Sequence, residues 1–308
     1  MNKGVLTIAQ GKQQYIDLAK NLAISLSIHN PGLKKALVTD SNDPELKKLY
    51  DIVIPIDKSI GIGFIQKLYI RDYTPFDETL FIDVDCLVVS DINFLWEPFN
   101  KCDVSVIGRK VFEGELFGFS LLDIQNRLGV KYVISFNGGV YYFKKNEKAK
   151  MIFDKSKDIV KNYDAYNIVK VRGEIADEPL MSLAMGLHNQ EPIDDHGKGM
   201  YTPVGQNGHF KMDVLREYCD FNKNGKVVSP AIMHFGFGHT QAFHYRREKM
   251  KLKLVYYYRI PKIVASMLVN VVYNPPYIGY VFLYRLIKTI VKRTKFKVFP
   301  LMPMFRFE

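Results

Sequence analysis

Short apolar runs alternate with amphipathic stretches over the first ninety residues of the chain. Apolar runs rich in β-branched residues predict buried strands, and apolar residues that recur every three or four positions predict helices. These patterns place strands at residues 4–9, 36–38, 52–56 and 79–89, and helices at residues 15–30, 44–50 and 63–73. Strands that alternate with helices in this way predict an α/β fold with a parallel, doubly wound sheet.

The composition is that of a globular protein. Of the 308 residues 47% are hydrophobic, and the chain holds 19 Tyr and 21 Phe, which excludes a disordered or low-complexity protein. Three scattered cysteines, Cys86, Cys102 and Cys219, are too few for a disulfide framework or a zinc site and suggest a reducing compartment. We expect no signal peptide, because the residues after Met1 do not form a basic region followed by a long apolar one.

The net charge of +11 is concentrated in one part of the chain. Residues 1–244 hold 29 basic and 30 acidic side chains, whereas residues 245–297 hold 13 basic side chains and one acidic side chain. We therefore expect a near-neutral domain at residues 1–244 and a basic, tyrosine-rich helical tail at residues 245–308.

The tail contains a run of 22 uncharged residues, 263–284, which is long enough in principle to span a bilayer. Asn274, Pro275 and Pro276 divide this run into halves too short to cross, and basic clusters flank both sides. This pattern favours a helix pair lying on an anionic membrane surface, at the cytoplasmic face of the inner membrane. A helical subdomain packed on the sheet and a single spanning helix are the alternatives. Nucleic acid is disfavoured as a partner, because apolar runs outweigh base-reading polar residues.

Two carboxylates, Asp83 and Asp85, interrupt the apolar run at residues 79–89. The Asp-x-Asp pattern is weak by itself, because chance gives roughly one match in a chain of this size. Its position adds weight, since ligands of open α/β sheets bind beyond the carboxyl ends of the strands. Two carboxylates one residue apart can hold Mg²⁺ or Mn²⁺ and leave positions for phosphate oxygens. The alternative is an acid pair that caps the next helix, a role that Asp91 would repeat.

Three further polar elements are candidates for the same site. His234 follows the apolar run 227–232, so it is either a structural residue at a strand end or an imidazole ligand beside the two carboxylates. The segment Asn137–Gly139 lies between two apolar runs, as either a hairpin turn or a close approach of backbone to a sugar. Asp177 and Glu178 open an apolar helix, where an N-cap explains one acid but not both.

The order of these elements resembles that of a GT-A glycosyltransferase, specifically the retaining glycosyltransferase family 8, which includes glycogenin and lipopolysaccharide galactosyltransferases. The resemblance covers roughly residues 4–240 and rests on these stretches: 6–9 with Tyr15 and 25–26, Lys67-Leu68, 81–88, 136–141, 177–181 and 233–236. It implies a GT-A fold, with a Rossmann-like sheet that is mixed but mostly parallel and is flanked by helices. The basic helical tail would be an extension of that fold.

The resemblance also implies a role for each matching residue. The implied metal ligands, for Mn²⁺ or Mg²⁺, are Asp83, Asp85 and His234. The implied catalytic residues are Asn137, Asp177 and Glu178. The residues implied to contact the nucleotide or the donor sugar are Ala9, Tyr15, Lys67, Asp83, Val84, Gly138, Gly139, Gly236 and His239. For Lys67 the alternative is a solvated helix face, and for Tyr15 it is a core position.

The chain departs from the family at two places. Family members often have Lys-Pro-Trp after the late His-x-x-Gly element, whereas here no Lys or Trp follows Gly236 promptly. His239, Gln241 or Arg246 would then have to supply the missing diphosphate contact. The second departure is Glu178, where the family has Gln; this acid leaves both retention and inversion of the sugar configuration open.

The implied activity is metal-dependent transfer of a sugar from a nucleotide diphosphate sugar, with UDP as the first choice of nucleotide, to a glycan or glycolipid acceptor in surface polysaccharide synthesis. The cation would act as a Lewis acid on the leaving diphosphate. A sugar nucleotidyltransferase is one alternative, but residues 9–13 lack the Gly-rich basic loop that it needs. A non-catalytic membrane-surface protein is another, and the presence of Asp83, Asp85 and His234 argues against it.

Overall fold

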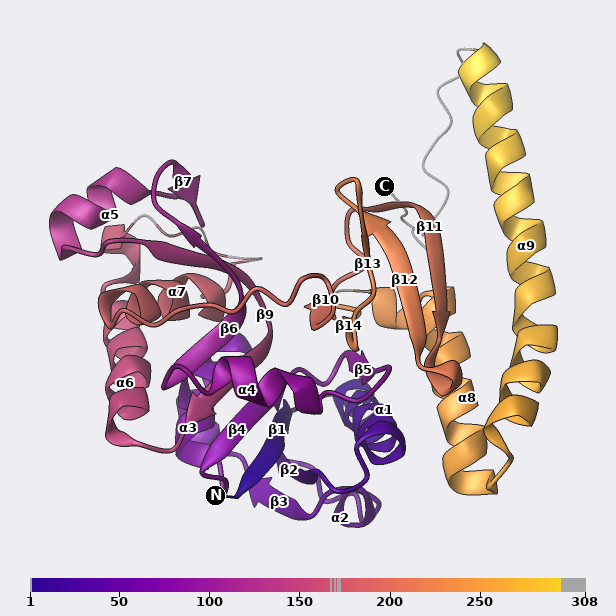
Figure 1. Ribbon diagram of the computed structural model, residues 1–308, viewed down its shortest axis with the longest axis horizontal. Helices are drawn as coiled ribbons and strands as arrows, with labels where there is room; N and C mark the ends of the chain where they lie inside the picture. Colours follow the sequence, from indigo (N-terminus) through magenta and orange to yellow (C-terminus); the bar gives the residue numbers. More distant parts are fainter. Residues whose placement is uncertain (1, 167, 169, 171–172, 237, 295–308) are drawn as a thin grey trace.

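The computed structural model describes residues 2–166, 168, 170, 173–236 and 238–294, with the backbone alone for residues 283–294. A six-stranded sheet with the order β3-β2-β1-β4-β9-β6 forms its centre (Figure 1). Its strands are β1 (Lys3–Ala9), β2 (Lys34–Thr39), β3 (Ile52–Pro55), β4 (Glu78–Ile82), β6 (Val104–Val111) and β9 (Val133–Lys144). Strands β3, β2, β1 and β4 run parallel, and β9 runs antiparallel to both β4 and β6. The predicted α/β fold with a mixed, mostly parallel sheet is confirmed.

Helices cover both faces of this sheet because neighbouring residues of each strand point to opposite sides. Leu6 and Phe81 belong to the core that also holds buried residues of α6 (Glu147–Lys161) and α7 (Asp177–Leu187). Val5, Leu80 and the aromatic residues of α4 (Trp96–Phe99) share a core on the other face with α1 (Gln13–His29). Full burial on both faces explains why these strands read as continuous apolar runs.

The predicted strand at residues 79–89 is two strands in two different sheets. Strand β4 ends at Ile82, and β5 (Cys86–Val88) pairs with β14 (Ile232–His234) in a small sheet of order β10-β14-β5. The third strand of that sheet is β10 (Met200–Tyr201). The apolar pattern is the same on both sides of the break, so only the two acids mark the turn at residues 83–85.

Two predicted helices differ from the structure in type or length. The segment 63–73 is a 3₁₀ helix, η2 (Gly63–Tyr69), followed by one turn of α-helix, α3 (Ile70–Tyr73). The side chain of Gln66 donates to the backbone oxygens of Asp57 and Gly61, which keeps the backbone before η2 in a tight loop. The segment 44–50 contains only the short helix α2 (Leu46–Leu49).

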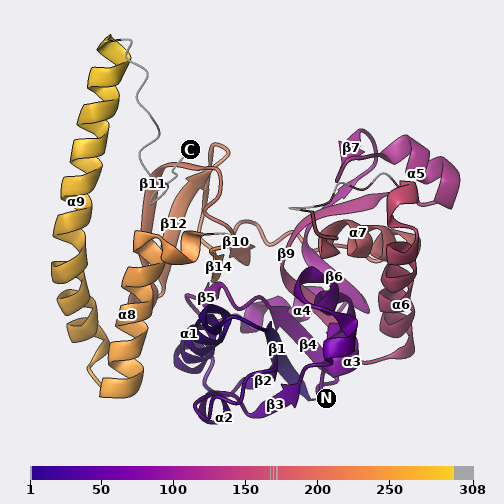
Figure 2. The ribbon, with the colours of Figure 1, turned by 180° about the vertical axis from the view of Figure 1, so that it is seen from behind.

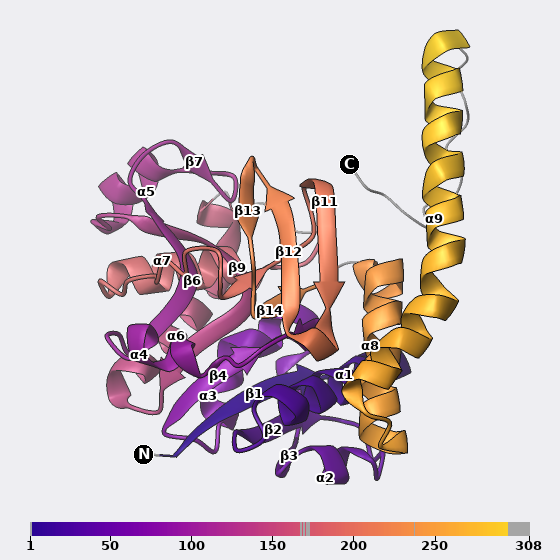
Figure 3. The ribbon, with the colours of Figure 1, turned by 45° about the vertical axis from the view of Figure 1, so that its right-hand side comes forward.

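The other elements lie around these two sheets (Figure 3). The remaining strands are β7 (Glu115–Leu116), β8 (Phe119–Ser120), β11 (Gln206–Asp213), β12 (Tyr218–Lys223) and β13 (Lys226–Val228). The remaining helices are η1 (Lys58–Ile60), η3 (Asn93–Leu95), α5 (Leu121–Leu128), η4 (Tyr163–Tyr166), η5 (Val214–Arg216), η6 (His239–Gln241), α8 (Phe243–Tyr258) and α9 (Lys262–Thr294).

The tail begins inside the folded body. Helix α8 packs beside α1 (Figure 2), and the buried Tyr245 hydroxyl accepts a hydrogen bond of 3.1 Å from Asn21. Fully buried Lys251 lies 3.0 Å from Asp213 and 3.1 Å from Glu248, so its charge is paired within the protein. A division after residue 244 therefore passes through a helix that shares the core of α1.

Helix α9 differs from its predicted form. The predicted break at residues 274–276 is absent, because α9 continues through Pro275 and Pro276, and the chain turns instead between α8 and α9. Both proline rings are exposed, and Arg247 holds the preceding Asn274 by a hydrogen bond of 3.2 Å. Figures 1 and 3 show α9 at the edge of the molecule, reaching beyond α8. None of the helices in the described part of the chain has the length and apolar character needed to cross a bilayer.

Candidate active site

The predicted metal ligands meet where the large sheet gives way to the small one. Asp83 and Asp85 lie in the turn between β4 and β5, and His234 ends β14. The antiparallel register of β14 and β5 places His234 opposite Cys86, and the backbone N–H of Phe235 donates to the Asp85 carbonyl over 3.0 Å. Strand pairing therefore brings the imidazole to the acid pair.

The side chains of these residues converge. The Nε2 atom of His234 lies 3.1 Å from Asp85 Oδ1 and 3.8 Å from Asp83 Oδ2. Asp85 Oδ1 is buried, faces this nitrogen, and has no hydrogen-bond partner elsewhere in the described part of the chain. A buried carboxylate oxygen of this kind requires a cation or a proton donor in front of it.

The donor set fits a hard divalent cation. Carboxylate oxygen and imidazole nitrogen suit Mn²⁺ and Mg²⁺. Adjacent ligand atoms of an octahedral ion with bonds of about 2.1 Å lie about 3 Å apart, which matches the separation of His234 Nε2 and Asp85 Oδ1.

A neighbouring thiol is a poorer donor for such an ion. The donor atoms of Asp85, Cys86 and His234 all lie within 4.8 Å of one another. Burial raises the pKa of the Cys86 thiol well above its ordinary value, so that it stays neutral. Neutral sulfur is a weak ligand for a hard cation, and the carboxylate of Asp83 is the better third ligand.

The two carboxylates of the acid pair have different electrostatic surroundings. Burial raises the pKa of Asp83, and the charge of Lys67 only partly offsets this effect. Burial acts in the same direction on Asp85, but the hydrogen bond and charge of His234 outweigh it and hold the pKa of Asp85 below its ordinary value. Burial alone would lower the pKa of His234, yet Asp85 and Asp83 raise it. In the absence of a metal the imidazole and Asp85 therefore stabilise each other's charged forms.

Lys67 is a nearly buried cation at the centre of the site. Its ammonium lies 2.7 Å from Asp83 Oδ2, 3.0 Å from the Gly138 carbonyl oxygen and 3.6 Å from Asp177 Oδ2. Burial would lower its pKa, but Asp177 and Asp83 outweigh burial and hold the pKa above its ordinary value. The alternative that Lys67 lies on a solvated helix face is wrong, because this lysine joins the acid pair to α7.

The segment Asn137–Gly139 lies inside the continuous strand β9, so the hairpin-turn alternative is wrong. Both glycines allow a site residue to pack directly on the strand. A Cβ atom at Gly139 would lie 2.5 Å from His234 Nδ1, and one at Gly138 would lie 2.8 Å from Asp177 Oδ2. The close approach of backbone here is to protein side chains, and it sets their positions.

Asp177 and Glu178 both face the site from the first turn of α7. The N-cap of α7 is Ala176, so the alternative that Asp177 caps this helix is wrong. Glu178 Oε1 accepts a hydrogen bond of 2.7 Å from the Gly138 N–H. Burial, and then the charge of Asp177, raise the pKa of Glu178 above its ordinary value. The two carboxylates consequently compete for the positive charge of Lys67.

Tyr141 is a site residue that the sequence pattern did not indicate. This fully buried tyrosine donates a hydrogen bond from its hydroxyl to Asp177. A Cβ atom at Gly138 would lie 3.2 Å from this hydroxyl, so Tyr141 reaches the same side of β9 as Asp177. The pairing of β9 with β6 is irregular between Phe136 and Tyr141, and no local pattern of the sequence indicated this contact.

The other residues implied to contact the donor lie on several elements of the fold. Ala9 is buried at the carboxyl end of β1, and Val84 is the middle residue of the turn between the two acids. Tyr15 is 39% exposed on α1, so the alternative of a core position is wrong. Gly236 follows β14 with a φ of +37°, and burial lowers the pKa of His239 in η6. Their contacts with a donor stay predictions.

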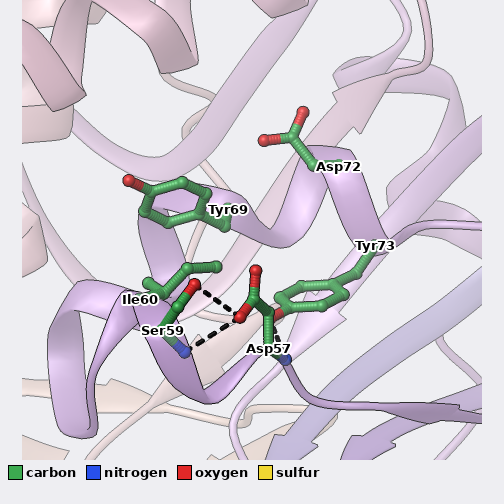
Figure 4. A pocket seen from close by; sticks show the side chains of 6 residues that line it. All are labelled: Asp57, Ser59, Ile60, Tyr69, Asp72 and Tyr73. Carbon is green, nitrogen blue, oxygen red and sulfur yellow. Dashed lines mark hydrogen bonds between the residues drawn. The ribbon is translucent and has the colours of Figure 1, made fainter.

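A surface cavity of about 470 Å³ lies elsewhere in the molecule (Figure 4). Its lining residues come from η1, η2, α3 and the residue before η1: Asp57, Ser59, Ile60, Tyr69, Asp72 and Tyr73. Asp57 accepts hydrogen bonds from the backbone and hydroxyl of Ser59, and Asp72 is paired with Lys157 at 2.7 Å. Its acids are therefore engaged within the protein, and the candidate active site is the junction at Asp83 and Asp85.

Comparison with known proteins supports the fold. No family model and no curated protein matches the sequence. The galactosyltransferase LgtC, solved with donor and acceptor sugar analogs, matches with a TM-score of 0.50 at 15% identity, over 76% of this chain and 87% of that one. An active-site glutamine-to-glutamate mutant of LgtC matches over the same shares with a TM-score of 0.51 at 15% identity. The chain has a GT-A-like fold that resembles glycosyltransferase family 8.

A further match differs in length. The glycosyltransferase GlyE of Streptococcus pneumoniae TIGR4 matches 63% of this chain with a TM-score of 0.44 at 18% identity. This chain spans only 46% of GlyE, less than half of its length. The GT-A fold class and the resemblance to family 8 expected from the sequence are confirmed by the LgtC structures.

Proposed function

We propose that this protein is a metal-dependent glycosyltransferase that moves a sugar from a nucleotide diphosphate sugar, with UDP as the nucleotide, to a glycan or glycolipid acceptor. The observation that carries the proposal is the convergence of Asp83, Asp85 and His234 at the sheet junction of a GT-A-like fold. LgtC, which has a similar fold, was solved with donor and acceptor sugar analogs. These two facts together favour sugar transfer over other activities of α/β proteins.

The chain supplies a cation site and a fixed positive charge for a leaving diphosphate. Asp85 Oδ1 and His234 Nε2 would hold Mn²⁺ or Mg²⁺, with Asp83 as the third ligand. When bound, the cation supplies Lewis-acid stabilisation of negative charge on phosphate oxygens. Lys67 already lies against Asp83, where its ammonium adds to that stabilisation without needing to reorganise.

We propose that the sugar is transferred with retention of configuration, as in the family that the chain resembles. Retention needs no strong base on the acceptor, whereas inversion needs one. Glu178 is a candidate base, but its Oε1 already accepts a hydrogen bond of 2.7 Å from the Gly138 N–H, which holds this carboxyl group on β9. Its side chain has the size and shape of the glutamine that the family carries, and either side chain can accept this hydrogen bond through an oxygen.

A donor screen tests this proposal. The full-length protein is incubated with UDP-, GDP- and CMP-sugars, with and without Mn²⁺, and nucleotide release is measured. We expect release of UDP that depends on Mn²⁺. Pyrophosphate exchange would favour a sugar nucleotidyltransferase instead, and absence of turnover with every donor would favour a non-catalytic binding protein.

We also propose that the protein works at the surface of an anionic membrane, on its cytoplasmic face. The support is a stripe of exposed apolar side chains along α9, formed by Ile263, Val264, Met267, Leu268, Val271, Val272, Ile278 and Phe282. Exposed apolar surface of this extent is typical of a site of interaction with a membrane or a protein. The excess of basic residues in the same tail favours an anionic lipid surface as the partner.

A further inference from the structure

The side-chain oxygen of Asn137 receives two hydrogen bonds. One comes from the backbone N–H of Gly139 over 3.1 Å, and the other joins it to His234 Nδ1 over 2.6 Å. A backbone N–H can only donate, so the Asn137 atom at this position must be the acceptor oxygen and not the amide nitrogen. The bond to the imidazole therefore runs from the Nδ1–H of His234 to Asn137.

This direction decides which nitrogen of His234 is free to bind a metal. A neutral imidazole carries one proton, and with that proton on Nδ1 the lone pair lies on Nε2. Nε2 is the atom that faces Asp85 Oδ1 at 3.1 Å and Asp83 Oδ2 at 3.8 Å. The ring is also held from the side, because it packs so closely on Gly139 that a Cβ there would overlap Nδ1.

We infer that Asn137 is a positioning residue for the metal ligand: it holds His234 with its proton on Nδ1 and directs Nε2 at the divalent cation. This inference rests on the metal dependence proposed above and gives Asn137 a role other than contact with the donor sugar. Histidines that bind metals donate their second N–H to an acceptor, and removing that acceptor weakens metal binding by about 10–100-fold. Asn137 supplies that acceptor across 97 residues of sequence.

Two substitutions at Asn137 separate the acceptor from the rest of the side chain. Asn137→Leu keeps a branched side chain of similar size without the acceptor, whereas Asn137→Asp keeps the oxygen. Binding of Mn²⁺ alone to the full-length protein is measured from the electron paramagnetic resonance signal of free Mn²⁺, with no nucleotide present. We expect Asn137→Leu to weaken Mn²⁺ binding by about 10–100-fold and Asn137→Asp to retain it.

A double-mutant cycle with His234→Ala shows whether Asn137 acts through the imidazole. In the His234→Ala protein, the further change Asn137→Leu should leave Mn²⁺ affinity unaltered. If His234→Ala by itself does not weaken Mn²⁺ binding, the proposed metal site is wrong. If it does, and folded Asn137→Leu still binds Mn²⁺ like the unmodified protein, only the role of Asn137 is overturned.

Two other results would also overturn this role. One is an equal loss of Mn²⁺ binding in Asn137→Asp and Asn137→Leu, since the acceptor would then be irrelevant. The other is unchanged Mn²⁺ affinity in Asn137→Ser, whose side chain is too short to reach the imidazole. This variant replaces Asn137→Leu if circular dichroism shows that Asn137→Leu does not fold.

Discussion

The ammonium of Lys67 lies 2.7 Å from Asp83 Oδ2, so that a cation of the protein already neutralises one carboxylate of the acid pair. The same nitrogen lies 3.6 Å from Asp177. Lys67 is therefore a counter-charge shared by the turn after β4 and the first turn of α7.

Replacing Lys67 by methionine should destabilise the protein by about 3–5 kcal/mol, because it leaves buried carboxylates without their counter-charge. Urea denaturation measures the free energy of unfolding. The matched control is Lys161→Met, which removes an exposed ion pair with Asp158 and should cost less than about 1 kcal/mol. Equal stability of the two variants would show that Lys67 is not needed to compensate the acids.

The variant Asp85→Asn should reduce Mn²⁺-dependent release of UDP by more than about 100-fold. It removes the negative charge of the carboxylate whose pKa is held below its ordinary value, and that charge would bind the cation. Asp91→Asn is the control. Asp91 is exposed and accepts a hydrogen bond from the Asn93 N–H, which an asparagine can also accept. Normal turnover in Asp85→Asn would rule out the metal assignment.

A methyl group added at Gly139 should displace His234, since the Cβ would lie 2.5 Å from its Nδ1. We expect Gly139→Ala to lose about 1–3 kcal/mol of stability through overpacking and to bind Mn²⁺ more weakly. Gly32→Ala is the control, because a Cβ there would meet no atom within 4 Å. Both are compared by urea denaturation and Mn²⁺ titration; an unchanged Mn²⁺ affinity in Gly139→Ala would contradict the geometry described.

Acid should destabilise the protein in part through His29. Burial lowers the pKa of His29 to about 4 in the folded protein, against about 6.5 when unfolded. The unfolded chain therefore binds a proton first as the pH falls, and up to about 3 kcal/mol of stability is lost between pH 6.5 and pH 4. His29→Leu should remove this part of the pH dependence in urea denaturation at several pH values. If the free energy of unfolding falls equally with pH in His29→Leu and in the unmodified protein, this prediction is wrong.

The double variant Val271→Glu/Val272→Glu should bind more weakly than the unmodified protein to vesicles that contain an anionic lipid. Both valines lie on the exposed apolar stripe of α9, and their side chains are 72% and 66% exposed. Val227→Glu, which alters an equally exposed residue of β13, should bind like the unmodified protein. Co-sedimentation with vesicles measures the difference. Equal binding of all three proteins would exclude this face as the membrane contact.

Point variants are preferable here to removal of the tail. The charge pattern by itself suggests a cut at residue 245, with the basic segment as a separable unit. Such a cut removes Tyr245 and Leu252, which are buried in the core beside α1. A loss of activity after that deletion would then reflect unfolding of the protein and not loss of its contact with the membrane.

The sequence contained enough to predict the sheet and the acidic end of its fourth strand. The strands β1, β2 and β3 are short, mostly apolar runs bounded by polar residues, and helices separate them, so their pattern is unambiguous. Asp83 and Asp85 stood out because a buried strand rejects charge. His234 was recognisable as a polar residue at the end of an apolar run.

Other features depend on tertiary contacts that no local pattern carries. The apolar run 79–89 gives no sign that β5 leaves the large sheet, since both halves are equally apolar. Continuation of α9 through Pro275 and Pro276 contradicts the local rule for proline. The hydrogen bond between Asn137 and His234 joins residues on different sheets, and only the folded chain reveals it.

The pairing of β14 with β5 has a consequence for synthesis of the protein. A ribosome makes the chain from the N-terminus, so all strands of the large sheet and both acids of the turn are complete long before His234 is added. An unfinished chain, or one cut short before residue 234, thus has a sheet without its imidazole. Binding of the proposed metal by all three side chains must therefore wait until β14 has been made and has paired with β5.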